Sequence, residues 1–146
     1  MSQSRPQADQ ETLALMQELG GQWSVRAVVF NTCPASWAYP FPQGETAWTT
    51  REGRLKITSR THAGSLELWP AEDWRLTREV SATYGPCSGR QSLELVVEEY
   101  GGAWLRGVFV SKVGYDGGAQ CDAAAQREGI AADGCETRVE WMAIRH

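Results

Sequence analysis

Three charged residues share a strand face with apolar neighbours in this sequence: Arg78, Arg106 and Glu99. Arg78, for example, alternates with Leu76 and Val80. A charge on the inner face of a closed sheet must be paired or must serve a ligand. Two interpretations follow. In the first, Arg78 or Arg106 forms an internal ion pair with Glu99. In the second, one of these two arginines holds the carboxylate or another polar head of an apolar ligand.

Aromatic residues on the predicted strands are the second feature that bears on binding. Seven tryptophans are many for 146 residues. Large rings spaced along short strands are typical of small barrels and of surfaces that line a ligand, although core packing alone also explains them. The candidates to lie beside the body of a ligand are Trp48, Tyr84 and Trp104.

Catalytic and metal-binding patterns are missing from the sequence. His62 and His146 are the two histidines, and neither stands near a serine or cysteine nucleophile in sequence. We find no glycine-rich phosphate loop, metal-ligand spacing or nucleophile elbow. The sequence therefore predicts no catalytic residue, no metal and no cofactor. Two acidic pairs, Glu52 with Glu67 and Glu98 with Glu99, are interpreted as solvated surface. A glycosidase-type pair of carboxylates stays open, because such a pair needs only proximity in space.

One short helix and eight strands are predicted to position these residues. Asp9 can cap a helix over 9–19, and Gly20 can end it in the left-handed conformation. The alternation of apolar residues and the turn signals then predict strands over 22–32, 45–50, 55–60, 65–69, 74–84, 91–100, 103–113 and 135–144.

Short links between these strands favour an antiparallel meander that closes into an up-and-down barrel. The predicted fold class is all-β, an eight-stranded antiparallel barrel with a short N-terminal helix. In such a barrel, successive links alternate between the two ends. The long links at 33–43, 61–64, 85–90 and 114–134 fall at one end, the mouth. The tight links and the helix fall at the other end, the floor. We expect residues 1–8 to be an extended or disordered tail and 9–146 to be one domain.

All four cysteines fall at the mouth end of the predicted barrel: Cys33, Cys87, Cys121 and Cys135. They were not used to assign the links to the two ends, so their agreement supports the predicted topology. We expect two disulfides, Cys121–Cys135 and Cys33–Cys87, although four cysteines allow three pairings. Paired cysteines imply a secreted or periplasmic protein. Free cysteines would instead fit the cytoplasm, and residues 1–10 lack the features of a signal peptide.

Composition excludes several classes of partner. The net charge is −4 at pH 7, which argues against nucleic-acid binding because such proteins normally carry a basic face. No apolar run reaches the length of a transmembrane helix. The oligomeric state stays open.

The chain resembles the lipocalins and the wider calycin families. The match is Gly21-Gln22-Trp23, which opens the first strand after a short helix. The resemblance implies that Trp23 packs across the barrel floor and that a basic residue beyond the last strand, here Arg145, lies over it. No family motif is evident between strands six and seven, and no long helix follows strand eight.

The resemblance and the residue pattern together predict binding or transport of a small apolar or amphipathic molecule in a barrel cavity. Two alternatives remain. One is a small barrel enzyme of the isomerase or cyclase type, with a tyrosine or a carboxylate as acid or base. The other is a filled barrel that acts as an interaction module, with the aromatic loop 37–41 as its contact patch.

Overall fold

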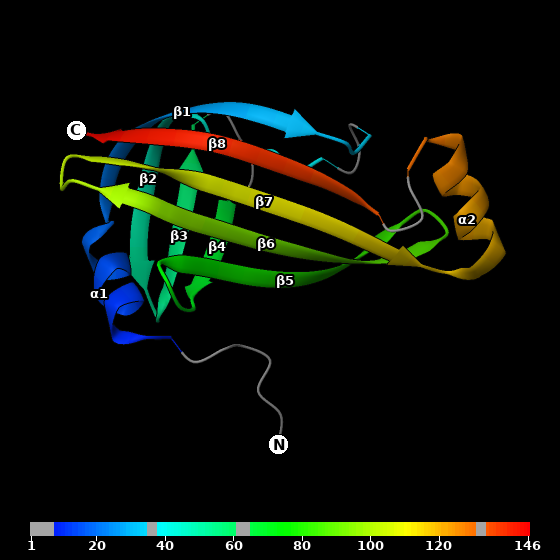
Figure 1. Ribbon diagram of the computed structural model, residues 1–146, viewed down its shortest axis with the longest axis horizontal. Helices are drawn as coiled ribbons and strands as arrows, with labels where there is room; N and C mark the ends of the chain where they lie inside the picture. Colours follow the sequence, from blue (N-terminus) through cyan, green and yellow to red (C-terminus); the bar gives the residue numbers. More distant parts are fainter. Residues whose placement is uncertain (1–7, 35–37, 61–64, 131–133) are drawn as a thin grey trace, which may run out of the picture.

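The computed structural model describes residues 8–34, 38–60, 65–130 and 134–146, without the side chains of Ala82 and Tyr84. Eight strands and two helices lie in these ranges (Figure 1). The helices are α1, Gln10–Glu18, and α2, Gly118–Arg127. The strands are β1 Gly21–Asn31, β2 Gly44–Arg51, β3 Arg54–Ser59, β4 Ser65–Pro70, β5 Arg75–Tyr84, β6 Cys87–Tyr100, β7 Trp104–Asp116 and β8 Cys135–Arg145.

The strands form a closed antiparallel barrel in the order β1 to β8, which confirms the predicted fold class. Closure comes from β1, which pairs with β2 on one side and with β8 on the other. The β2–β3 link is a tight turn, because Glu52 and Gly53 both adopt positive φ, 56° and 75°. The expected tail over 1–8 falls almost wholly outside the described residues.

The barrel has two unlike halves because its strands differ in length. β1 pairs with β2 only from Gly21 to Val25, and β4 pairs with β5 only at Trp69↔Thr77 and Pro70↔Leu76. Beyond these points β5, β6, β7, β8 and β1 continue as a five-stranded sheet toward α2 (Figure 1). We call the part enclosed by all eight strands the floor half, and this continuation the mouth half.

The long mouth half was only partly expected. The β5–β6 link was predicted as a turn over 85–89, but Tyr84 pairs directly with Cys87 and the turn shrinks to two residues. Gly85 adopts φ 60° there. As a result β6 begins four residues before the expected start, and β7 runs on to Asp116.

Helix α1 is tied to the floor by its N-terminus. The Asp9 carboxylate accepts hydrogen bonds from the backbone N–H groups of Thr12, at 2.7 Å, and Asp73, at 3.1 Å. Hydrogen bonding from the Thr12 side chain, together with these two backbone bonds, holds the pKa of Asp9 below its ordinary value. The Trp74 N–H also donates to the Thr12 hydroxyl. At the other end, the expected positive φ falls on Gly21, at 140°, and not on Gly20.

Trp23 and Arg145 close the floor below the barrel core. Trp23 is fully buried, and its Nε1 donates to the Leu19 carbonyl at 2.9 Å. The Arg145 guanidinium lies 4.4 Å from the Trp23 ring centroid, the place that the lipocalin resemblance implies. It also donates to the carbonyls of Glu18 and Gly20, near the C-terminal end of α1, and of Gly102.

A line of aromatic rings fills the interior above Trp23. Trp23 packs on Trp48, Trp48 on Trp141, Trp141 on Phe41 and Phe41 on Phe109, with ring centroids 5.0–6.4 Å apart. Each of these rings is at most 3% exposed. Phe41 comes from the loop between β1 and β2, so this loop folds into the barrel and supplies part of the core.

Two disulfides join elements of the mouth half, and the described residues hold no free cysteine. This confirms that all four cysteines pair at one end, but the predicted pairing is wrong. The bonds are Cys33–Cys135 and Cys87–Cys121. Cys33 meets Cys135 because β1 and β8 are neighbours whose register places Asn31 opposite Thr137. Cys121 lies on α2, which packs against the start of β6.

Neither described helix is long and apolar enough to cross a membrane.

Candidate functional site

Arg78 is the charged side chain that the mouth half places on its inner face. It lies on β5 opposite Leu93, which is 3% exposed and belongs to the core. Arg78 itself is half-buried. Its guanidinium carbon lies 5.7 Å from the centroid of the Trp69 ring. Within the described part of the chain, no carboxylate pairs with Arg78, so its charge is left for another group to balance.

Tyr39, in the loop between β1 and β2, lies close enough to Arg78 for its phenol to respond to the arginine's charge. Its ring is half-buried and packs 5.4 Å from Phe109. Burial raises the pKa of the Tyr39 phenol, and the charge of Arg78 partly offsets this rise. The phenol therefore stays a neutral hydroxyl at pH 7, able to donate or accept a hydrogen bond beside the arginine.

The other polar groups of this inner face are paired with one another. Gln91 Nε2 donates to the Ser111 hydroxyl at 2.9 Å. The Thr137 hydroxyl donates to Asn31 Oδ1 at 2.9 Å. Ser111 and Thr137 are fully buried, so these bonds compensate the loss of water. The contrast singles out Arg78, which has an aromatic face beside it but no anion.

Trp141 carries a second unsatisfied group, deeper in the barrel. Its Nε1 is buried and has no hydrogen-bond partner in the described part of the protein. Buried polar groups in folded proteins are nearly always hydrogen-bonded, so an orphan N–H marks a place for an acceptor atom. Trp141 stacks against Phe41, a residue that lies in a loop and belongs to no strand.

The predicted aromatic site residues do not gather around Arg78. Trp48 is buried in the floor half, where it packs on Trp23. Trp104 is 40% exposed and lies on the outer face of the barrel beside Ile144. Its expected place in the cavity is therefore wrong. The side chain of Tyr84 lies outside the described part of the molecule.

Arg106 and Glu99 lie on the outer face, so the expectation that they point inward is wrong. Arg106 Nε donates to Glu99 Oε1 at 2.7 Å, and both side chains are nearly half exposed. Glu99 leaves the inner face because the register shifts between Val97 and Glu99, which reverses the alternation. On β7 the inward residues are Leu105 and Phe109, and Arg106 belongs to the opposite face.

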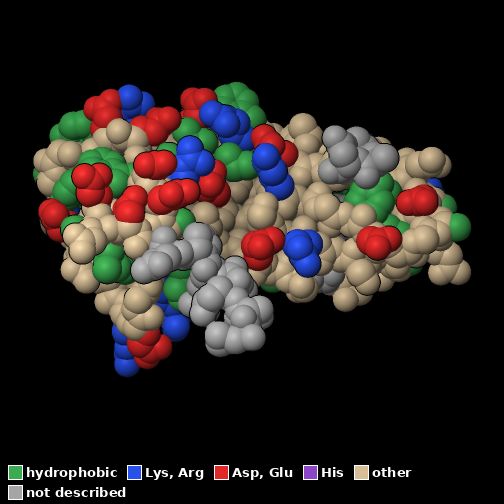
Figure 2. All heavy atoms as spheres, turned by 60° about the horizontal axis from the view of Figure 1, so that its bottom comes forward, with side chains coloured by type: hydrophobic (Ala, Val, Ile, Leu, Met, Phe, Trp, Pro, Cys, Tyr) green, Lys and Arg blue, Asp and Glu red, His purple; other side chains and the backbone are tan. Residues whose placement is uncertain are grey.

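Several surface charges are paired with each other. Arg106 contacts Glu98 as well as Glu99, and Arg54 contacts Glu52 and Glu67. Figure 2 shows acidic and basic side chains next to one another over one face of the barrel. The interpretation of these acids as solvated surface holds for the contacts described.

Ser24, Glu45 and His146 form a hydrogen-bonded cluster that sequence reasoning missed. His146 Nε2 lies 2.6 Å from the Ser24 hydroxyl and 2.7 Å from Glu45 Oε2, and the hydroxyl also contacts Glu45. In a Ser-His-acid relay the acid holds the other ring nitrogen. Here both partners use Nε2, so the cluster lacks the geometry of a relay. The register Ser24↔Glu45 was the signal that could have located it. His62 lies outside the described residues.

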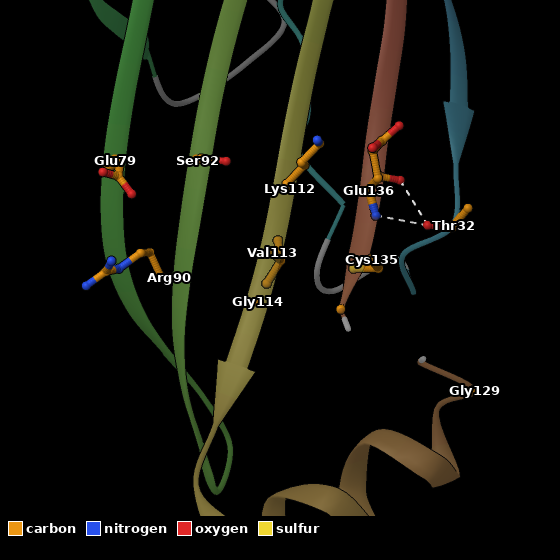
Figure 3. A pocket seen from close by; sticks show the side chains of 11 residues that line it. Thr32, Glu79, Arg90, Ser92, Lys112, Val113, Gly114, Gly129, Cys135 and Glu136 are labelled. Carbon is orange, nitrogen blue, oxygen red and sulfur yellow. Dashed lines mark hydrogen bonds between the residues drawn. The ribbon is translucent and has the colours of Figure 1, made fainter. Parts of the chain in front are cut away.

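A hollow of about 740 Å³ lies on the outer face of the mouth half, between the strands and the end of α2 (Figure 3). Its charged residues are two acids and two bases, Glu79, Arg90, Lys112 and Glu136. Arg90 and Lys112 are exposed, and Gly114, Gly129 and Gly134 contribute only backbone. Such a mixture of charges gives no preference for an anion or a cation.

Tyr39 and Phe41, the described aromatic residues of the loop between β1 and β2, do not form the expected exposed patch. Phe41 is 3% exposed, and Tyr39 is half-buried against the core. Trp37, the third aromatic residue of this loop, lies outside the described residues. These two rings pin the loop in place and are not free to contact a partner.

The described residues contain no group of three or more potential metal ligands.

No protein-family model matches the chain, and comparisons with curated proteins and with solved structures find no significant match.

Proposed function

We propose that the protein binds a small amphipathic molecule with an acidic head group, held by Arg78 in the mouth half. The apolar part of the ligand lies inward, toward Tyr39 and Trp141. The fold is calycin-like in its closed eight-stranded barrel. Membership of the lipocalins is part of the proposal and rests on Gly21-Gln22-Trp23 and on the position of Arg145 over Trp23.

One observation carries the proposal: Arg78 is half-buried on the inner face without an acidic partner in the described chain. Withdrawing a charge from water is costly unless an opposite charge or hydrogen bonds compensate it. The Trp69 ring supplies a weak cation–π contact, but it offers no acceptor for the five N–H donors of a guanidinium. A carboxylate or another oxyanion would supply both the charge and the acceptors.

The surroundings of Arg78 support an amphipathic ligand over a fully polar one. Tyr39, whose phenol responds to the charge of Arg78, packs on the apolar ring of Phe109 and offers a neutral hydroxyl. The orphan Nε1 of Trp141 can donate to one acceptor atom of the ligand or to a water molecule. An anionic head at Arg78 and an aliphatic or aromatic body beneath it would use both environments.

The two disulfides support a place in an oxidising compartment, and we propose that the protein works outside the cytoplasm. This location fits a carrier of a sparingly soluble acid. Residues 9–146 are proposed to act as one binding domain.

The test is a titration with dodecanoate and, in parallel, with dodecanol, which has the same chain but no charge. Arg78→Leu should weaken dodecanoate binding by about 1.5–3 kcal/mol, which is the contribution of a charge-assisted hydrogen bond. That is a loss of roughly 10- to 150-fold in Kd. Dodecanol binding should change little.

Arg106→Leu is the matched control, because Arg106 is an arginine on the outer face that pairs with Glu99. It should leave both affinities unchanged. Equal dodecanoate affinity in the wild type and in Arg78→Leu would contradict the proposal, and so would an equal loss for the acid and the alcohol.

A further inference from the structure

The second half of β1 has a free edge. Thr32 N–H donates to Glu136 O, and His146 N–H donates to Gln22 O, so the even-numbered backbone groups of β1 face β8. The backbone groups of Ala27, Val29 and Asn31 therefore face the other side. β2 leaves that side after the pair Val25↔Gly44, and no other described strand pairs there.

This free edge is unusually apolar. Val28 is 59% exposed, Val29 46% and Phe30 52%. Val29 lies on the inner face of the sheet, while Val28 and Phe30 lie on the outer face, so both faces of the strand are apolar and accessible to solvent. Unpaired N–H and C=O groups next to exposed apolar side chains are a template for pairing with another strand.

The opposite edge of the mouth half, on β5, differs in its chemistry. Beyond Thr77↔Trp69 it too lacks a neighbouring strand in the described chain. It carries Arg78, Glu79, Ser81 and Thr83. Charged and polar residues of this kind are how natural sheets protect an edge from pairing. The contrast indicates that the β1 edge is left apolar because something covers it.

We propose that a second copy of this chain covers the β1 edge, by antiparallel pairing of β1 with β1 about a two-fold axis at Val29. This register uses residues 26–32, the whole segment beyond the pairing with β2. Val29 lies opposite Val29 of the second copy, and Val28 lies opposite Phe30. The first pair brings apolar side chains together on the inner face, and the second does so on the outer face. Ala27 and Asn31 then form the flanking hydrogen-bonded pairs.

The self-complementary register favours a second copy over an unrelated strand, because the same exposed apolar residues meet on both sides of the axis. Arg26 lies opposite Thr32 of the other copy, whose own neighbour across β8 is Glu136. Within one molecule, Phe30 lies beside Arg138 and Val28 beside Glu140. Pairing Phe30 with Val28 therefore places Arg138 of one copy and Glu140 of the other in the same cross-strand row. The register therefore sets no like charges directly opposite each other, while the opposite charges of the two β8 strands, three strand spacings or about 14 Å apart, add little.

The oligomeric state of the full chain in solution tests this interface. Sedimentation velocity over a series of concentrations should show a species with twice the mass of the 16.1 kDa chain. Val29→Lys places two like charges against each other at the axis and should weaken the dimer by about tenfold or more. Ser81→Lys, the matched change on the free edge of β5, should leave the dimer intact.

A cross-link tests the register independently of the lysine variant's ability to fold. Directly opposed residues of a hydrogen-bonded antiparallel pair have Cα atoms about 5.5 Å apart, within the range that a disulfide spans. Val29→Cys should therefore give a covalent dimer under mild oxidation, and Ala27→Cys, which faces Asn31, should not. A wild-type chain that stays monomeric into the millimolar range would overturn the proposal. So would equal cross-linking of the two cysteine variants, or a dimer that Val29→Lys leaves unchanged.

Discussion

The floor half and the mouth half of this barrel are stabilised in different ways. The floor half is closed by eight strands, filled by tryptophan rings and covered by Arg145. The mouth half has five strands with two free edges, and two disulfides hold it at its far end. Its inner face mixes half-buried and polar residues with a second, smaller apolar cluster beside α2, which includes Val113, Ala125 and Ile130.

This difference separates stability from function within one sheet. A half that is packed to the centre has no room for a ligand, while a half that is incompletely covered needs covalent links to stay ordered. The unsatisfied groups follow the same division. Arg78, without a described acidic partner, lies in the mouth half, and the orphan Nε1 of Trp141 lies at the level of the Phe41 ring that the loop inserts.

The largest expected effect concerns the covalent links of the mouth half. Cys33 and Cys135 are 102 residues apart, and Cys87 and Cys121 are 34 apart. In the chain-entropy model, replacing the first pair by alanine costs about 4.7 kcal/mol and replacing the second about 3.8 kcal/mol. Chemical unfolding of the two double variants measures both losses.

The division between the halves would be undermined if neither disulfide contributed to stability. It would be sharpened if hydrogen exchange in the double variants increased in β5–β8 beyond the floor but not around Trp23 and Trp48.

A smaller effect is expected from Arg145→Met in the floor half. The change removes the cation from the Trp23 ring and three hydrogen bonds to backbone carbonyls. We expect a loss of about 2–3 kcal/mol in the free energy of unfolding. Arg106→Met, which breaks exposed ion pairs on the outer face, should produce no resolvable loss. Equal unfolding curves for the two variants would contradict the role given to Arg145.

The smallest effect is a shift in the titration of Tyr39. Burial raises the pKa of this phenol above its ordinary value of 10.0, and Arg78 opposes the rise. Arg78→Leu should therefore raise the pKa of Tyr39 further. Absorbance of the phenolate, taken as the difference from Tyr39→Phe, isolates this residue from the other tyrosines. An unchanged or lowered pKa would place Arg78 away from Tyr39.

The same shift has a consequence for stability. Because the folded state keeps the Tyr39 phenol neutral to higher pH than the unfolded chain does, this residue favours folding below about pH 10. The contribution is lost as the pH rises through the raised pKa of the folded state.

Sequence patterns located the strands and the end of the barrel at which each link falls, because alternation and turn residues are local signals. The register places Arg78 opposite the buried Leu93, and its role toward a ligand stays a prediction. The faces of Glu99 and Arg106 were wrong for two separate reasons. A register shift before Glu99 is invisible in an alternating pattern, and both faces of β7 carry apolar residues.

The disulfide pairing shows the limit more clearly. The closure of β1 on β8 was predicted, and it already places the ends of these strands side by side, so Cys33–Cys135 follows from the fold. The prediction instead joined Cys121 to Cys135, because these two cysteines flank the same loop and are close in the sequence. The place of Cys121 depends on how α2 packs against β6, which no local pattern encodes.

The most direct test of the central claim is a crystal structure of the protein with dodecanoate. We predict the carboxylate within hydrogen-bonding distance of the Arg78 guanidinium, with the chain running inward past Tyr39 toward Trp141. A carboxylate bound in the outer hollow at Arg90 and Lys112, or an inner face that stays free of ligand at saturation, would contradict the account.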